Sequence, residues 1–154
     1  MVETGKPAPD FTLVDQQGNK VTLSMLKGSP IVLYFYPKDD TPGCTKEACA
    51  FRDAIADYQA AGAKILGVSP DTVDSHAKFV KKYELPFPLL ADTDHSVCEL
   101  FGVWKEKSMY GKKYMGVERT TFVIDGKGIV RQVFPKVKVD GHSPAVLETL
   151  RACG

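Results

Sequence analysis

Residues 31–36 (IVLYFY) are apolar at every position and show no alternation between apolar and polar side chains. A strand with one solvent-facing side alternates, so this pattern is typical of a strand buried on both faces of a helix-covered sheet. Pro37 ends the segment, and Thr41 followed by Pro42 suits the cap and first position of a helix. The chain is therefore constrained to an α/β architecture in which a buried strand leads directly into a helix.

The remaining pattern alternates between strands and helices. Strand–helix–strand units require right-handed crossovers and give parallel strands, while hairpins at both ends add antiparallel ones. We therefore expect one domain over residues 1–154, an α/β fold with a central mixed sheet flanked by helices and an N-terminal β-hairpin. Strands are expected at residues 11–14, 21–23, 31–36, 64–68, 89–91, 120–124 and 129–133, and helices at 42–59, 75–83, 95–101 and 143–150.

Charge and hydropathy exclude several classes of protein. The chain has 20 Lys and Arg against 19 Asp and Glu, a net charge of +1, which argues against a general nucleic-acid binder or a partner of anionic membranes. Residues 31–36 form the longest apolar run, far short of the roughly 20 residues that span a bilayer. The first residues lack the basic and apolar regions of a secretory signal, so we expect a cytoplasmic location.

The cysteines are too few for a disulfide scaffold, which leaves core packing, catalysis, redox sensing or metal binding. Cys44 falls in the first turn of the helix after the buried strand. Free backbone N–H groups and the helix dipole favour an anion at this position. They therefore favour the thiolate, which is the nucleophilic form of cysteine. Gly43 has no side chain and would leave room for a small substrate to approach the Cys44 sulfur. The Thr41 hydroxyl, three residues upstream, would be near enough to form a hydrogen bond at the same place. The four cysteines are Cys44, Cys49, Cys98 and Cys153.

Cys49 follows Cys44 at i+5. On an intact helix this offset is about 140° around the axis and about 7.5 Å along it, which separates the two Cα atoms by about 8.6 Å. A disulfide needs Cα atoms closer than about 7 Å. The two cysteines can therefore bond only if the helix unwinds. Thioredoxin-type reductases use Cys-x-x-Cys instead, so this spacing argues against that class.

The segment YFYPKDDTPGCTKEAC at residues 34–49 closely resembles the bacterioferritin-comigratory-protein, or PrxQ, branch of the peroxiredoxins. The resemblance covers nearly the whole chain, including residues 5–11, 67–69, 87–92 and 119–125. It implies a thioredoxin-like fold and a thiol peroxidase that needs no metal or organic cofactor. It also implies a peroxide substrate, thioredoxin or a similar dithiol protein as reductant, and a monomer.

The same resemblance implies roles for individual residues. Cys44 matches the peroxidatic cysteine, and Cys49 matches the resolving cysteine that forms an intramolecular disulfide with it. Pro37 and Thr41 match residues that shield and orient the peroxide, and Arg119 matches the arginine that stabilises the thiolate. Some members carry the resolving cysteine in the next helix, but residues 75–83 contain no cysteine.

Two other functions remain open from the sequence: a redox sensor that uses a Cys44–Cys49 disulfide, and a metal-binding module of Cys44, Cys49, Cys98 and His95. Cys98, beside apolar neighbours, is more typical of a core residue. We expect Glu47 to be solvated, with a proton relay as the alternative. Further expectations are an exposed thiol at Cys153, surface positions for His76 and His142, and a solvated basic loop over 105–113. For Trp104, Tyr110 and Tyr114 we expect ordinary partial burial, with a place at the active-site mouth or contact with a partner as the alternative.

The cysteine spacing predicts that oxidation unfolds the start of the helix. Formation of the Cys44–Cys49 disulfide should abolish amide-exchange protection over residues 44–50, because the bond cannot form on an intact helix. Hydrogen–deuterium exchange of the oxidised and reduced proteins measures this. Identical protection of these residues in the two states would contradict the prediction.

Overall fold

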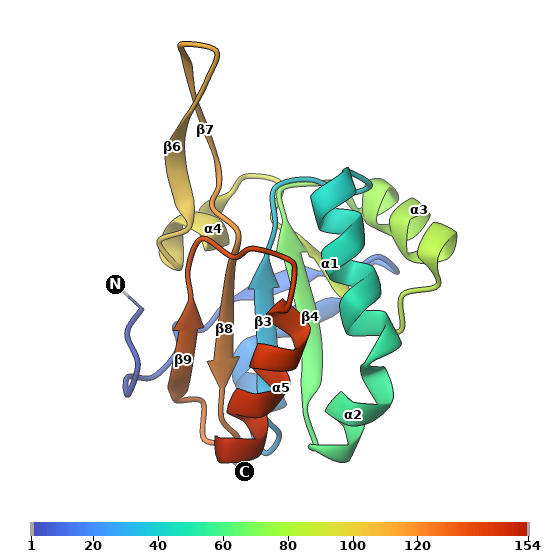
Figure 1. Ribbon diagram of the computed structural model, residues 1–154, viewed down its shortest axis with the longest axis vertical. Helices are drawn as coiled ribbons and strands as arrows, with labels where there is room; N and C mark the ends of the chain where they lie inside the picture. Colours follow the sequence, from blue (N-terminus) through green and yellow to red (C-terminus); the bar gives the residue numbers. More distant parts are fainter. Residues whose placement is uncertain (1, 154) are drawn as a thin grey trace.

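The computed structural model describes residues 2–153, which build a seven-stranded sheet in the order β2-β1-β5-β4-β3-β8-β9 (Figure 1). β3, β4 and β5 are parallel, whereas β1, β8 and β9 run antiparallel to their neighbours. The expected mixed sheet and both terminal hairpins are confirmed. The strands are β1 (Thr12–Val14), β2 (Lys20–Thr22), β3 (Ile31–Phe35), β4 (Lys64–Ser69), β5 (Leu89–Ala91), β8 (Thr120–Ile124) and β9 (Val130–Phe134).

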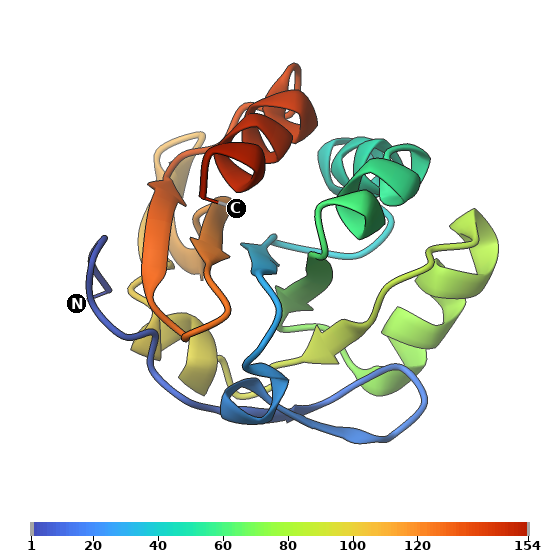
Figure 2. The ribbon, with the colours of Figure 1, turned by 90° about the horizontal axis from the view of Figure 1, so that it is seen from below.

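Helices cover both faces of this sheet (Figure 2). α1, α2, α3 and α5 pack on one face, and α4 packs on the other together with the short helix η1. No helix in the described chain is long and apolar enough to cross a membrane. The helices are η1 (Leu23–Leu26), α1 (Pro42–Asp53), α2 (Ile55–Ala60), α3 (Val73–Tyr83), α4 (Ser96–Leu100) and α5 (His142–Cys153).

β3 is buried along its whole length, as its apolar pattern predicted. Successive side chains of a strand point to opposite faces, so Val32 and Tyr34 join the core under α1 and α5, while Leu33 and Phe35 join the core under α4. The sheet is thus fixed on both sides of β3. The loop after β3 and the start of α1 are held at the edge where the parallel strands end.

The helix expected over residues 42–59 is interrupted, which corrects the sequence prediction. Ala54 has φ −101° and ψ 12°, and its N–H bonds back to the Phe51 carbonyl at 3.2 Å, three residues away. This tight turn ends α1 and starts α2 in a new direction. Both Phe51 and Tyr58 stay buried across the break, with ring centroids 5.7 Å apart.

A second correction concerns the basic loop expected over 105–113. It is a two-stranded hairpin of β6 (Trp104–Met109) and β7 (Lys112–Val117) that is separate from the main sheet. Figure 1 shows it rising beyond the end of the sheet. Most of its side chains are exposed on both faces, so its sequence lacks the apolar–polar alternation by which a half-buried strand is recognised.

The packing of Phe51 predicts its contribution to stability. Its side chain is 1 % exposed, and its ring lies 4.9 Å from that of Tyr34 and 5.9 Å from that of His142. Phe51→Ala should lower the free energy of unfolding by about 3–5 kcal/mol, through lost burial and the cavity left behind. Urea denaturation measures this. Met25→Ala, at a side chain 82 % exposed, should change stability by less than about 0.5 kcal/mol.

Candidate active site

The loop between β3 and α1 places Cys44 at the start of a helix. Thr41 is the N-cap residue with extended backbone, and Pro42 takes the first helical position, as predicted. The Thr41 hydroxyl does not cap the helix; it donates to the carbonyl of Lys38 at 2.9 Å. Pro37 lies half-buried at the beginning of the same loop.

Asp39 ties this loop to α3. Its carboxylate accepts hydrogen bonds from the Tyr36 hydroxyl at 2.6 Å and from the Ser75 hydroxyl at 2.8 Å, and it pairs with His76 Nδ1 at 2.7 Å. The Asp39 N–H donates to Asp71 at 2.8 Å. His76 is fully buried, so its predicted surface position is wrong.

The ligand atoms of Asp39, Asp71 and His76 lie within 4.8 Å of one another, close enough to hold a metal ion. In this structure Asp39 Oδ2 bonds His76 Nδ1, Asp71 Oδ2 accepts from the Asp39 N–H and the Ser69 hydroxyl, and the second ring nitrogen of His76 bonds the Leu90 carbonyl at 2.9 Å. A metal ion bound by His76 Nδ1 would have to break the bond between His76 and Asp39. The cluster is accounted for as a buried polar network whose members satisfy each other.

Cys44 is 1 % exposed and faces Arg119. The Arg119 Nη2 lies 3.3 Å from the Cys44 Sγ, although the two residues are 75 positions apart. Arg119 sits between β7 and β8, and β8 pairs antiparallel with β3, so the topology brings it to the start of α1. A Cβ at Gly43 would come within 3.1 Å of Arg119 Nη2. A side chain here would therefore crowd the guanidinium.

Glu47 is the main site residue that the sequence analysis misjudged. It is 1 % exposed rather than solvated, and its Oε1 accepts from Arg119 Nη1 at 2.7 Å. Burial raises the pKa of Glu47 to about 7, although Arg119 opposes the shift. The sequence did contain one indication of this burial. Cys44, Glu47 and Phe51 are spaced i, i+3 and i+7, which places them on the same face of the helix.

Arg119 carries the positive charge of the site. Burial opposes its charged form, but Glu47 and Cys44 outweigh burial and raise the pKa of the guanidinium. His142 Nε2 lies 4.0 Å from Glu47 Oε2, and burial, assisted by Arg119, lowers the pKa of His142 to about 4. His142 is therefore neutral at pH 7 and adds no second positive charge beside Arg119. It is 7 % exposed, so its predicted surface position is wrong.

Lys107 of β6 is a further cation that sequence reasoning treated as solvated. It is half-buried. Its pKa is lowered by burial first and then by Arg119, and Cys44 acts in the opposite direction. Lys107, in the middle of β6, therefore interacts electrostatically with Arg119 and Cys44.

The four cysteines occupy different surroundings. All are free thiols; Cys49 is half-buried on α1, one turn beyond Cys44. Cys98 is fully buried in the core under α4, on the opposite face of the sheet from Cys44, so the proposed four-ligand metal set is not brought together. The expected core position of Cys98 is confirmed. Cys153 is exposed at the end of α5, also as expected.

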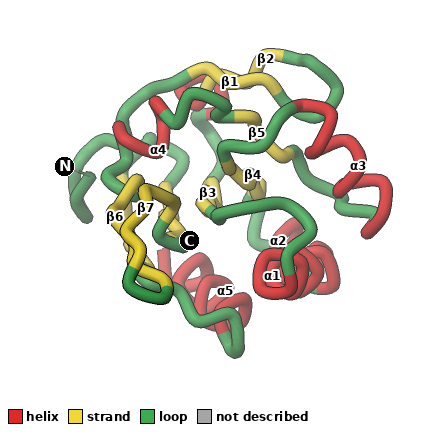
Figure 3. Tube along the Cα trace, turned by 90° about the horizontal axis from the view of Figure 1, so that it is seen from above, coloured by secondary structure: helices red, strands yellow, loops and turns green. Residues whose placement is uncertain are grey.

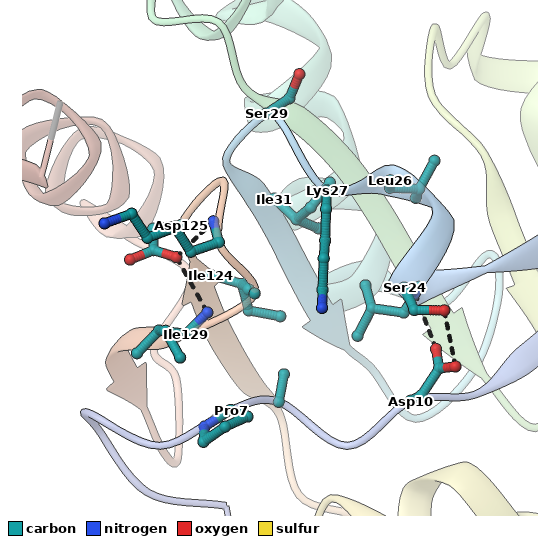
Figure 4. Close-up of a pocket in the computed structure, with 14 residues that line it drawn as sticks. Pro7, Asp10, Ser24, Leu26, Lys27, Ser29, Ile31, Ile124, Asp125 and Ile129 are labelled. Carbon is teal, nitrogen blue, oxygen red and sulfur yellow. Dashed lines mark hydrogen bonds between the residues drawn. The ribbon is translucent and has the colours of Figure 1, made fainter.

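A cavity of about 190 Å³ lies at the other end of the sheet, beneath η1 and the β8–β9 turn (Figure 4). It is lined by Ile31 at the start of β3, whereas Cys44 follows the end of that strand. Its two carboxylates are already bonded, Asp10 to Ser24 and Asp125 to the Ile129 N–H. This cavity is separate from the Cys44 site.

Comparison with known proteins identifies the family. The AhpC/TSA family model matches residues 4–133. The chain belongs to the AhpC/TSA family and, within it, to the Bcp/PrxQ peroxiredoxins. It is 51 % identical to peroxiredoxin Bcp of Bacillus subtilis over 150 residues, which covers 97 % of this chain and 96 % of that protein.

Solved peroxiredoxin structures share the fold. Bacterioferritin comigratory protein of Xanthomonas campestris is 45 % identical, with a TM-score of 0.91 over 97 % of this chain and 98 % of that one. PrxQ of Xylella fastidiosa is 36 % identical, with a TM-score of 0.93 over 99 % and 97 % of the two chains. The thioredoxin-like fold is thereby confirmed, and this peroxiredoxin is a thiol-dependent peroxidase.

The raised pKa of Glu47 predicts how stability depends on pH. Because the pKa rises from 4.5 to about 7 on folding, the native state holds more protons than the unfolded chain between these values. The free energy of unfolding should therefore fall as pH rises through this window, by roughly 3 kcal/mol. Glu47→Gln should remove this component, since its amide does not titrate.

Urea denaturation of the reduced protein at pH 4.5 and 7.5 tests the prediction. The wild type should lose stability relative to Glu47→Gln between the two pH values. Glu148→Gln, which removes an exposed carboxyl from α5, controls for the change in net charge. A constant difference between wild type and Glu47→Gln would show that folding leaves the pKa of Glu47 unchanged, which would contradict the prediction.

Proposed function

We propose that the chain reduces hydrogen peroxide and organic hydroperoxides through Cys44, with Cys49 as the resolving cysteine and thioredoxin or a similar dithiol protein as the reductant. The observation that carries this proposal is the 3.3 Å approach of the Arg119 guanidinium to the buried Cys44 thiol at a helix N-terminus. Both the cation and the helix dipole favour the thiolate, the form that attacks an electrophilic oxygen.

In the first step the Cys44 thiolate attacks one oxygen of the peroxide. A sulfur–oxygen bond forms and the O–O bond breaks, which oxidises the sulfur to a sulfenic acid and releases the other oxygen as water or alcohol once it is protonated. Negative charge grows on the leaving oxygen. Arg119 is positioned to stabilise this charge in a site from which bulk water is largely excluded, where such interactions are strong.

Glu47 supports this step by orienting Arg119. The Glu47–Arg119 bond of 2.7 Å uses Nη1 and leaves Nη2 directed at the sulfur. Glu47 Oε2 has no hydrogen-bond partner in the described structure. The Thr41 hydroxyl and Pro37 belong to the same loop, and we assign them to positioning of the peroxide beside Cys44.

In the second step the Cys49 thiol attacks the sulfenic sulfur of Cys44. An S–S bond forms, the S–O bond breaks, and water leaves. Both cysteines lie on the intact helix α1, so the first turns must unwind before the sulfurs can meet. Cys49 is only half-buried, so its own side chain gives up little packing in this motion, whereas Cys44, Glu47 and Ala48 are buried in the intact helix.

An external dithiol completes the cycle. One of its thiolates attacks the disulfide to form a mixed disulfide, and its second thiol then displaces the protein sulfur. The reductant leaves as a disulfide, and Cys44 and Cys49 regain their thiols. The intramolecular disulfide needs no second subunit, so we propose a monomer that acts in the cytoplasm. The related protein from Xanthomonas campestris is described as reducing alkyl peroxides, which supports organic hydroperoxides as substrates.

Substitution of single cysteines tests the assigned roles. Peroxide loss is followed with thioredoxin, thioredoxin reductase and NADPH. Cys44→Ser should show no turnover, because the nucleophile is gone. Cys49→Ser should consume about one peroxide per chain and then stop, because its sulfenic acid cannot form the disulfide that thioredoxin reduces.

Cys153→Ser is the matched control, because it removes the exposed thiol at the end of α5 and should keep full turnover. Sustained thioredoxin-linked turnover in Cys49→Ser would refute the resolving role of Cys49. Retained peroxidase activity in Cys44→Ser would refute the whole mechanism.

A further inference from the structure

The β6–β7 hairpin exposes an unusual amount of apolar surface. Four of the six exposed large hydrophobic side chains of the described chain lie on it. The hairpin pairs with no strand of the main sheet, and Figure 1 shows it projecting from the body beyond α4. These side chains therefore do not serve the core. They are Met109, Tyr110, Tyr114 and Met115.

Tyr110 is the most informative of them. Met109 pairs with Lys112, which leaves Tyr110 and Gly111 as a two-residue turn with φ of 52° and 78°. Positive φ at both positions marks a turn that strongly favours Asn-Gly, Asp-Gly or Gly-Gly. Tyrosine is costly in this backbone conformation, and its side chain is 98 % exposed. Neither local conformation nor packing in the described structure explains a tyrosine at this position.

One face of the hairpin combines two of these side chains, Met109 and Tyr114, with positive charge. Side chains alternate between the two faces of a strand pair, and the register assigns each residue to a face. The face that we call the lysine face consists of Lys105, Lys107, Met109, Lys112, Tyr114 and Gly116. It is basic, although the chain as a whole carries a net charge of only +1.

The hairpin leads directly into the active site, because β7 ends two residues before the arginine that contacts Cys44. Lys107 packs against Gly116, with its Cδ 3.4 Å from where a Cβ would stand, and it is within electrostatic reach of Cys44 and Arg119. Arg119 itself follows β7 after a single residue. The hairpin and the start of α1 lie at the same end of the molecule, which is the top of Figure 1 and the end that faces the viewer in Figure 3.

We propose that the β6–β7 hairpin is a docking arm for the dithiol protein that reduces the Cys44–Cys49 disulfide, and that this partner presents acidic side chains beside an apolar surface around its reactive cysteine. The inference rests on the proposed function and identifies where its protein reductant binds. Exchange requires the partner's thiolate to reach the disulfide, so the partner must cover the end of the molecule that carries the hairpin.

The composition of the arm suits such a partner. Specific interfaces cover about 800 Å² on each protein, so a partner centred on Cys44 extends well beyond that residue. Aromatic and methionine side chains are enriched in interfaces, and methionine adapts to varied surfaces. The lysines steer an acidic partner toward the site and raise its association rate, an effect that salt screens.

Tyr110→Asn separates docking from folding. Asn suits the turn, so the melting temperature should stay the same or rise. With Escherichia coli thioredoxin as the probe, KM for thioredoxin should rise at least about fivefold, the loss expected for an interface anchor. Turnover with dithiothreitol, which needs no docking surface, should be unchanged. Met25→Ser, an exposed methionine on η1, is the matched control and should leave both reductants unaffected.

Charge reversal tests the lysines independently. Lys105→Glu with Lys112→Glu should lower kcat/KM for thioredoxin about tenfold at low salt, and the deficit should shrink in 0.5 M salt. The control pair, Lys64→Glu with Lys127→Glu, makes the same charge change at the opposite end of the sheet. Equal losses in both pairs, or an unchanged KM in Tyr110→Asn, would overturn the proposal.

Two further outcomes are informative. A wild-type dimer that Tyr110→Asn converts to a monomer, seen by sedimentation, would overturn the proposal by assigning the arm to self-association. Absence of peroxide turnover with dithiothreitol in the wild type would refute the proposed function itself. Normal turnover with dithiothreitol and an unaltered response to thioredoxin in the variants would refute the docking arm alone.

Discussion

The ion pair between Arg119 and Glu47 is the interaction on which the site depends. A guanidinium can sit beside an almost fully buried thiol only if its charge is compensated, because an unpaired buried charge is strongly destabilising. Glu47 supplies this compensation from the helix that carries Cys44, at 2.7 Å. The raised pKa of Glu47 shows that the pairing does not fully offset burial, so the site retains an energetic strain that a solvated carboxylate would not have.

The same pair explains why the sheet must be mixed. Arg119 precedes β8, and Cys44 follows β3; because these adjacent strands are antiparallel, the start of one lies beside the end of the other. A parallel neighbour would have brought its C-terminal end there instead. The N-terminus of α1, the arginine and the base of the β6–β7 hairpin therefore meet at one end of the molecule.

The proposed cycle would take this arrangement apart. The proposed disulfide requires the first turns of α1 to unwind, whereas the contact between Arg119 and Cys44 is made on the intact helix. Asp39 holds the preceding loop to α3 through hydrogen bonds to Ser75 and His76, so the loop would remain anchored in the proposed opening of α1. Because Glu47 lies between Cys44 and Cys49 on α1, the proposed unwinding would also disturb its ion pair with Arg119.

The sequence by itself determined the buried strand, the helix start at Cys44 and the mixed sheet, because these depend on local periodicity and capping. It also identified Arg119, although only through family resemblance. Only the tertiary structure revealed the burial of Glu47 and His142 and the existence of the β6–β7 hairpin. Burial of a polar residue depends on partners distant in sequence, and a hairpin exposed on both faces leaves no periodic signal. Local patterns fix the elements, whereas long-range packing decides which charges meet.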